Sequence, residues 1–225
     1  MKRDRRLREC LERSFGTYSG AALTVHGKIG AVFKCLGPAH IGLQLPWPEV
    51  HDVGARHGFQ GVELTTGVLD PPAERSTGRS PMTWTPAAIA RAPRPNRNEF
   101  IHTLPGALAL GARIDTPNVG LLMDTWHLFT SGGTPADIGS LRGEQVVHAH
   151  VDDAPAGAAQ DELIDTERLL PGALGVIHTR AVLTVVDEIG SDGPTLVEPF
   201  NAVVRALPPE ERVAAVAASM ESVWP

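Results

Sequence analysis

Residues 118–150, NVGLLMDTWHLFTSGGTPADIGSLRGEQVVHAH, are the stretch that decides how the chain can fold. Two apolar runs lie in this stretch, at residues 119–123 and 146–147. Each run leads into side chains that can bind a metal ion or move a proton, namely Asp124, His127, His148 and His150. Parallel strands deliver functional residues at their carboxyl ends in this way, so we expect a parallel sheet with a site along one edge.

Length and composition narrow the class of protein. The chain has 225 residues, of which 42% are hydrophobic, and this is enough for one well-buried domain. Its apolar runs fall short of the roughly 20 residues that a membrane span needs, so no membrane association is expected. The net charge of -6 lacks the basic surplus that binding to nucleic acid requires. Two cysteines, Cys10 and Cys35, are too few for a disulfide framework and favour a cytoplasmic location.

The chain divides into an extension and one domain. Residues 1–32 form an N-terminal extension without an assigned function, and they lack the apolar run of about 7–15 residues that marks a secretory signal. Residues 33–225 form the barrel domain. Within it, the segment 65–98 is dense in Pro, Arg, Ser and Gly, and we expect it to be an irregular loop apart from a short helical stretch at 87–92.

Elsewhere strands and helices alternate. A strand within 35–45, a helix over 48–57 and a strand at 61–64 predict a parallel pair with a right-handed crossover. Apolar spacing and turn residues predict further strands at 119–124, 145–151 and 195–198, and further helices at 105–114, 135–141, 179–189 and 208–224. This alternation is typical of the α/β class and of a (β/α) TIM barrel.

Three residues stand at the carboxyl ends of separate predicted strands. In a barrel, Asp124, His150 and Glu198 would converge on one mouth. One imidazole and two carboxylates suit a divalent transition metal, and three protein ligands leave positions open for water or substrate. His127, three residues after Asp124, could face the same cavity as a substrate contact.

Each residue also has a plainer interpretation. Asp124 could cap a helix or a turn, His150 could simply alternate between the faces of a strand, and Glu198 could be an ordinary charge at the rim. The occurrence of all three at successive strand ends favours the metal site.

Four motifs carry a family resemblance: LLMDTWHLFTSGG (121–133), VVHAHVDDA (146–154), ERLLPGALGVI (167–177) and EIGSDGPTLVEPFN (188–201). In this order and spacing they resemble the sugar phosphate isomerase/epimerase family with the xylose-isomerase-like TIM barrel. That family includes inosose dehydratase, hydroxypyruvate isomerase and ketose 3-epimerase relatives. Residues 37–64 look like the first strand, helix and second strand of the family.

The resemblance implies roles for individual residues. Asp124 and His150 resemble metal ligands of the family, and Glu198 resembles the glutamate that binds metal and exchanges a proton with substrate carbon. His127 looks like the histidine beside the substrate oxygen, and Arg168 like an arginine that holds a substrate hydroxyl or anionic group. The implied cofactor is one divalent ion, Mn, Zn, Co or Mg. The implied activity is isomerisation or epimerisation of a small sugar, sugar phosphate or polyol-derived ketose through an enediolate.

One family feature is absent from the pattern. Members carry another metal-binding glutamate on a middle strand, and no predicted strand supplies it here. We assign Glu63 to the rim, and Glu74 and Glu99 are no better placed. This absence favours isomerisation with one base over epimerisation with two.

Residues 65–118 are also too few for three further units of about 30 residues each. The third to fifth strands are therefore predicted to be missing or degenerate, which leaves the barrel incomplete. Open sheet edges invite pairing with another chain, so homo-oligomerisation through the gap is a hypothesis.

Two other functions stay open. A degenerate barrel remnant would bind a metal or a partner without turnover. A phosphodiester-cleaving relative of endonuclease IV would need more metal ligands and a basic groove, and the acidic balance counts against it.

Overall fold

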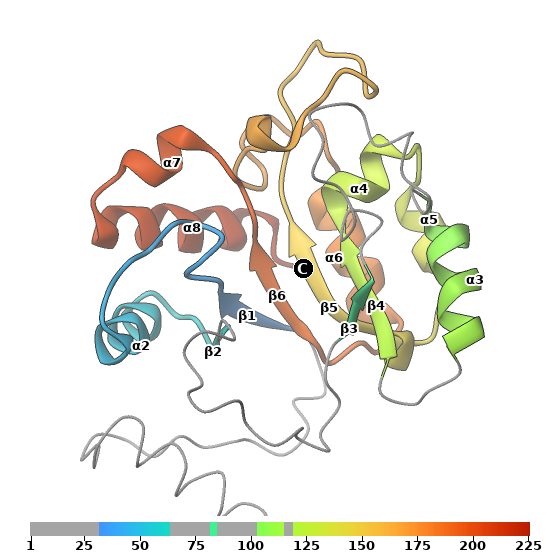
Figure 1. Cartoon of the computed structure of the whole chain (residues 1–225), viewed down its shortest axis with the longest axis horizontal. Helices are drawn as coiled ribbons and strands as arrows, with labels where there is room; N and C mark the ends of the chain where they lie inside the picture. The colour runs from blue at the N-terminus through green and yellow to red at the C-terminus, as the bar shows by residue number, and fades with distance from the viewer. Residues whose placement is uncertain (1–31, 64–81, 85–102, 115–118) are drawn as a thin grey trace, which may run out of the picture.

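The protein is described by a computed structural model that covers residues 32–63, 82–84, 103–114 and 119–225. The expected N-terminal extension lies outside these residues, apart from Val32. A single six-stranded parallel sheet forms the centre of the described structure (Figure 1). Its hydrogen-bonded strand order is β2-β1-β6-β5-β4-β3. The α/β barrel-like fold predicted from the sequence is confirmed.

Every pair of neighbouring strands in the sheet runs parallel. The carboxyl ends of all the strands therefore lie at one edge, where barrel proteins carry their sites. The strands are β1 Phe33–Leu36, β2 Gly61–Val62, β3 Met82–Trp84, β4 Val119–Asp124, β5 Val146–Val151 and β6 Pro194–Val197.

Helices connect the strands and pack around the outside of the sheet. In Figure 1, α2, α7 and α8 lie beside β1 and β6, while α3, α4 and α5 lie beside β4. The α-helices are α2 Trp47–Arg56, α3 Leu104–Ile114, α4 Thr125–Thr130, α5 Pro135–Ile138, α6 Thr179–Glu188, α7 Ala202–Ala206 and α8 Pro209–Val223. The described residues also form short 3-10 helices at Gly143–Gln145 and Asp165–Glu167. Among the described helices, none is both long and apolar enough to cross a membrane.

The barrel is incomplete in the part of the chain that the structure describes. A closed TIM barrel has eight strands, whereas this sheet has six and ends at β2 and β3. These two strands follow each other in sequence, so the gap in the described barrel wall lies between them. The three-residue β3 pairs with the outer edge of β4.

The expectation of a loop throughout 65–98 was wrong at Met82–Trp84. These residues pair with β4, for example Thr83 with Gly120. Three residues are too few to show an alternating pattern in sequence, and it is pairing with the edge of β4 that makes them a strand. The helical stretch expected at 87–92 lies outside the described residues.

Two short helices were not expected, and each begins at a polar cap. Asp124 accepts hydrogen bonds from the amides of Trp126 and His127 and starts α4. Asn201 accepts from the amides of Val203 and Val204 and starts α7.

The first strand also ends sooner than expected. It stops at Leu36, and the chain then turns, with the His40 amide donating to the Gly37 carbonyl. The strand predicted within 35–45 is thus correct only at its start.

The last helix, α8, forms where the sequence predicts a helix, and one of its faces packs against the sheet. Val213, Val216 and Met220 are buried against residues of β1 and β6, including Leu36 and Val197. This cluster fixes the position of the β1 and β6 ends relative to each other.

Arg212 of α8 ties the helix to two loops. Its guanidinium is buried and donates to the carbonyl oxygens of Ile41 (3.2 Å) and Gly42 (2.7 Å), which follow β1. It also donates to the carbonyls of Arg205 and Leu207, which end α7. The segments after β1 and β6 are therefore held by one side chain.

We predict that Arg212→Met lowers the free energy of unfolding by about 3 kcal/mol, because buried carbonyl oxygens lose their donor. Urea unfolding at pH 7 measures the effect. Glu211→Gln, at the exposed neighbouring position, should change stability by less than about 0.5 kcal/mol. If Arg212→Met were as stable as the wild type, the hydrogen bonds of Arg212 to the segments after β1 and β6 would not contribute to stability as proposed.

Candidate active site at the carboxyl ends of the strands

The three residues predicted as a site lie together. Asp124 ends β4, His150 lies in β5, and Glu198 follows β6 directly. Nδ1 of His150 is 3.2 Å from Oε2 of Glu198 and 4.0 Å from Oδ2 of Asp124. All three residues are buried. The parallel sheet therefore brings these strand ends into one polar cluster.

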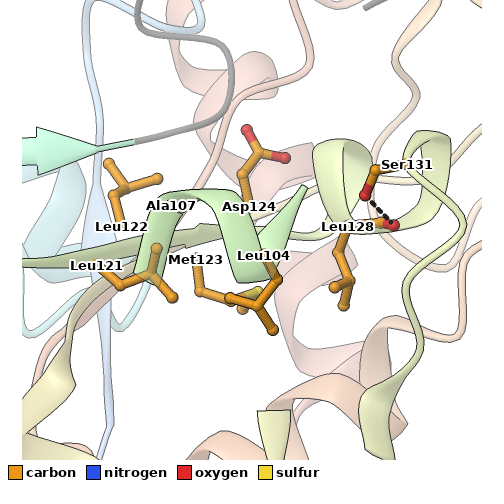
Figure 2. A pocket seen from close by; sticks show the side chains of 8 residues that line it. All are labelled: Leu104, Ala107, Leu121, Leu122, Met123, Asp124, Leu128 and Ser131. Carbon is orange, nitrogen blue, oxygen red and sulfur yellow. Dashed lines mark hydrogen bonds between the residues drawn. The ribbon is translucent and has the colours of Figure 1, made fainter. Parts of the chain in front are cut away.

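The alternation of side chains along β4 explains why Asp124 faces this cluster. Figure 2 shows Leu122 and Asp124 on one side of the strand, and Leu121 and Met123 on the other, toward α3. A cavity of about 20 Å³ lies between α3 and β4. It has room for about one water molecule and is too small for a substrate.

Arg168 is the centre of the cluster. Its Nη1 donates to Asp124 Oδ2 (3.1 Å), Asp152 Oδ2 (3.1 Å) and Glu198 Oε2 (3.0 Å), and so joins the ends of β4, β5 and β6. Its Nη2 donates to Asp165 Oδ1 at 3.0 Å. The side chain is 1% exposed, so these charged contacts are shielded from water.

Aromatic rings cover the guanidinium of Arg168. Its central carbon lies 5.4 Å from the ring centre of Trp126 and 5.2 Å from that of Phe200, within the range of cation–π attraction. Phe200 adopts a positive φ of 37°, which is strained for a bulky residue. Phe200 lies two residues after Glu198, and with this backbone conformation its ring packs beside Arg168.

Asp153 holds the loop that carries Arg168. Its carboxylate accepts hydrogen bonds from four backbone amides, those of Ala154, Leu174, Gly175 and Ile177. Asp153 and Leu169 also form a backbone bridge, at 3.0 and 2.9 Å. The loop after β5 is therefore folded back over the strand ends, and this brings Arg168 into the cluster.

His127 contacts Arg168. Nε2 of His127 is 2.9 Å from Nη2 of Arg168, and because a guanidinium only donates, Nε2 must be the acceptor. Burial lowers the pKa of His127, Asp124 opposes that effect, and the charge of Arg168 lowers the pKa further. The ring is therefore neutral and carries its proton on Nδ1.

Asp124 uses both of its carboxylate oxygens inside the protein. Oδ1 accepts from the amides of Trp126 (2.8 Å) and His127 (3.2 Å), and Oδ2 accepts from Arg168. The plainer interpretation of Asp124 as a helix cap is thus correct, and the residue also anchors the arginine.

His40 and Glu63 belong to the cluster although neither was predicted there. Nδ1 of His40 lies 2.7 Å from Oε1 of Glu198, and Nε2 lies 2.7 Å from Oε2 of Glu63. A Cβ on Gly37 would lie 2.6 Å from Cδ2 of His40, so glycine is needed for the ring to approach. Glu63, which we assigned to the rim, lies within the cluster.

One sequence signal could have indicated His40. It follows the first strand within GPAH, just as Asp124 and Glu198 follow theirs. The other candidates for the missing glutamate, Glu74 and Glu99, lie outside the described residues.

The charges in the cluster influence one another. Burial raises the pKa of Glu198, but contacts with His150 and His40 and the charge of Arg168 outweigh it and hold the pKa well below its usual range. Burial lowers the pKa of His40, but its hydrogen bonds to Glu198 and Glu63 outweigh this effect and raise the pKa to about 10. Because the pKa of Glu198 is lowered, this carboxylate is ionised at neutral pH.

The pKa of Asp152 is raised, whereas that of Glu198 is lowered. Burial raises the pKa of the Asp152 carboxyl group well above its usual range, Arg168 opposes the shift, and the carboxylates of Asp124 and Glu198 add to it. The raised pKa of Asp152 favours the protonated form of this carboxyl group, and a proton there reduces the repulsion among the acids.

The cluster contains a group of side chains that could hold a metal ion. One ligand atom each from His40, His150 and Glu198 lies within 4.8 Å of the other two. Nδ1 of His150 faces Oε2 of Glu198 at 3.2 Å, whereas Nε2 is buried and has no hydrogen-bond partner among the described residues. Such an unpaired buried nitrogen is costly unless it binds something, so the donor set fits a metal ion.

Comparison with known proteins identifies the class to which the fold and site belong. Residues 93–223 match the family described as xylose isomerase-like TIM barrel. This match covers more than half of the chain, and the chain belongs to this family. The resemblance noted in the sequence is thereby confirmed.

Two curated relatives are similar over about half of the chain. A 3-dehydroshikimate dehydratase of Pseudomonas aeruginosa is 34% identical over 110 residues, which are 48% of this chain and 17% of the relative. An inosose isomerase of Bacillus licheniformis is 28% identical over 116 residues, which are 50% of this chain and 40% of the relative. The chain thus spans less than half the length of both relatives.

Solved structures share the fold. A xylose isomerase domain protein from Alicyclobacillus acidocaldarius has a TM-score of 0.66 at 19% identity, covering 86% of this chain and 98% of its own. The IOLI protein with a bound zinc atom has a TM-score of 0.52 at 19% identity, covering 82% of this chain and 54% of its own.

We predict that Arg168→Met lowers the free energy of unfolding at pH 7 by about 3–5 kcal/mol, because buried carboxylates lose their cation. Burial raises the pKa of Asp124 and of Glu198, but charged neighbours that include Arg168 lower both overall. Carboxyl groups with lowered pKa values stabilise the fold above pH 4 and lose that contribution as the pH falls. The difference between wild type and variant should therefore shrink from pH 7 to pH 4.

Urea unfolding at both pH values tests this prediction. Arg142→Met, which removes an exposed arginine paired with Glu144, is the matched control and should change stability by less than about 1 kcal/mol. A penalty for Arg168→Met that is equal at the two pH values would contradict the electrostatic explanation.

Proposed function

We propose that the protein is a metal-assisted enzyme that moves a proton at a carbon next to a carbonyl group of a small sugar-like compound. Isomerisation through an enediolate is the reaction that the cluster supports best. The observation that carries this proposal is the ionised carboxylate of Glu198, held between His40, His150 and Arg168 at the carboxyl edge of the sheet.

Glu198 would accept and return the substrate proton. A general base must be ionised and held in place, and the three neighbours of Glu198 do both. They also lower its pKa and so weaken it as a base, which the acidified C–H bond of a metal-bound substrate would offset. One base of this kind suffices for isomerisation, in which the same carboxylate removes a proton from one carbon and returns it to the next. Epimerisation needs a second base on the opposite face, and no such base was predicted from the sequence.

A divalent ion, once bound, would polarise the substrate carbonyl and the neighbouring hydroxyl and so acidify the C–H bond between them. His150 and Glu198 would hold this ion, and Asp124 is the third ligand that the sequence predicts. The bound zinc atom of the IOLI protein supports a metal in this family.

Arg168 would act through the carboxylates that it contacts. Its expected role, to hold a substrate hydroxyl or anionic group, stays a prediction, since its described hydrogen bonds go to protein groups. We propose that it keeps Glu198 ionised and correctly oriented. His127 accepts a hydrogen bond from Arg168, which supports a positioning role. Its predicted contact with the enediolate oxygen would require the Nδ1 proton.

The two curated relatives suggest related chemistry. Isomerisation of an inosose and dehydration of 3-dehydroshikimate both begin when a proton leaves the carbon beside a carbonyl group. The reactions then differ in whether the proton is returned or a hydroxyl group is expelled. The proposed role of Glu198 is common to both, so the substrate class is a small polyhydroxylated carbonyl compound.

A second candidate is a degenerate barrel that binds metal without turnover. It is favoured by one observation, that both carboxylate oxygens of Asp124 are taken by the start of α4 and by Arg168. Metal binding without proton exchange on any tested carbonyl compound would support this alternative.

Partners and location stay predictions. We expect no nucleic acid or membrane partner and a cytoplasmic location. The outer strands of the described sheet, β2 and β3, suggest homo-oligomerisation through unpaired edges. Light scattering should then give a mass above that of one chain, and a monomeric mass would contradict this.

We predict that Glu198→Gln abolishes incorporation of solvent deuterium into substrate, because the amide cannot accept the proton. The assay follows exchange by NMR in heavy water with an inosose, 3-dehydroshikimate and small ketoses as test compounds. Glu198→Asp, which keeps a shorter carboxylate, should retain slow exchange.

Glu162→Gln is the matched control, because this exposed carboxylate lies in the same loop as Arg168. It should exchange at the wild-type rate. Undiminished exchange in Glu198→Gln would overturn the assignment of the base.

A further inference from the structure

The side chain of His40 lies where a metal ligand is needed. Its ring packs edge to face against that of His150, with 5.2 Å between the centroids, and its Nδ1 faces Oε1 of Glu198 at 2.7 Å. Three strand ends, those of β1, β5 and β6, therefore bring two imidazoles and one carboxylate together. This donor set differs from the one that the sequence predicted, which had Asp124 in place of His40.

Glu63 orients His40 for this task. Its Oε2 is 2.7 Å from Nε2 of His40, so it can accept the proton of that nitrogen. Nδ1, which faces Oε1 of Glu198, is then the nitrogen that would bind a metal ion, and the ion would displace its proton. Histidine ligands are commonly oriented by a carboxylate on their second ring nitrogen, and Glu63 has this relation to His40.

Asp124 is poorly placed to compete for the ion. Both of its oxygens are already hydrogen-bonded, to the first amides of α4 and to Arg168. A metal at Oδ2 would also lie beside the positive charge of the Arg168 Nη1, 3.1 Å from that oxygen. Glu198 also contacts Arg168, but through Oε2 alone, at 3.0 Å, so its Oε1, which faces His40, is the oxygen proposed to bind the ion. His40 and His150 have no described hydrogen bond to Arg168.

We propose that the protein binds one transition-metal ion through His40, His150 and Glu198, that Glu63 is the positioning residue for His40, and that Asp124 serves Arg168 instead of the metal. The site rests on the proposed function only in that the bound ion would assist the reaction. Two imidazoles and one carboxylate select Zn²⁺ or Co²⁺ and disfavour Mg²⁺, which prefers oxygen ligands.

Cobalt titration of the full chain, freed of metal by chelator dialysis, tests the proposal. Co²⁺ bound by nitrogen ligands absorbs visible light, so binding is measured without any enzyme assay. The wild type should bind one Co²⁺ per chain, Zn²⁺ should displace it, and excess Mg²⁺ should not. A wild type that binds no Co²⁺ would overturn the proposal.

Substitutions distinguish the two ligand sets. His40→Gln should weaken Co²⁺ binding more than about 100-fold, beyond the usual effect of residues outside the ligand set, and Glu63→Gln by about 10-fold. Asp124→Asn should weaken it by less than about 10-fold. Binding lost in Asp124→Asn and retained in His40→Gln would overturn the proposal in favour of the predicted set.

Loss of Co²⁺ binding could result from misfolding, so a further variant is designed to gain a new absorption band. His40→Cys should keep Co²⁺ and add the near-ultraviolet charge-transfer band of a thiolate bound to cobalt, which only a coordinating sulfur produces. His51→Cys, at an exposed histidine outside the cluster, is the control and should lack the band. A His40→Cys protein that binds Co²⁺ without the band would overturn the role of residue 40.

Co²⁺ binding and deuterium exchange together can refute the metal site and the proposed reaction independently. Wild-type Co²⁺ binding that depends on His40, together with no deuterium exchange on any test compound, would leave the site standing and refute the isomerase. If deuterium exchange depended on Glu198 but Co²⁺ binding were unchanged in His40→Gln, the proposed reaction would stand and the role of His40 as a ligand would be refuted.

Discussion

The buried guanidinium of Arg168 is the interaction on which the rest of the site depends. Four acidic residues approach this one cation, and three of them come from the ends of β4, β5 and β6. Isolated carboxylates at this depth would be expensive to bury, and the arginine makes their convergence tolerable. Because its planar fork donates in several directions at once, it can connect strand ends that a lysine could not.

This arrangement also determines what Asp124 can do. The residue satisfies α4 with one oxygen and Arg168 with the other, so its charge is already compensated inside the protein. The side chains on the β1 side of the cluster, His40 and His150, have nitrogens directed toward Glu198 instead. The side chains proposed to bind a metal ion thus come from the ends of β1, β5 and β6, and Glu198 contacts both the histidines and Arg168.

Part of the site was predictable, because a parallel sheet aligns the carboxyl ends of its strands. Asp124, His150 and Glu198 each follow an apolar run, and that pattern was enough to predict that they would meet. His40 and Glu63 were missed for a physical reason. The position of His40 after the first strand is a local signal, but its contact with Glu198 depends on β1 lying beside β6, and these strands are far apart in the chain.

The sequence by itself determined the alternation of strands and helices, the parallel sheet, the family and the residues at three strand ends, since each follows from local apolar spacing or from short motifs. Only the tertiary structure decided the strand status of Met82–Trp84, the use of both Asp124 oxygens and the contact of His40 with Glu198. Hydrogen bonds and charge contacts of this kind depend on which distant segments are packed side by side. That packing is a property of the whole fold and cannot be derived from any single stretch.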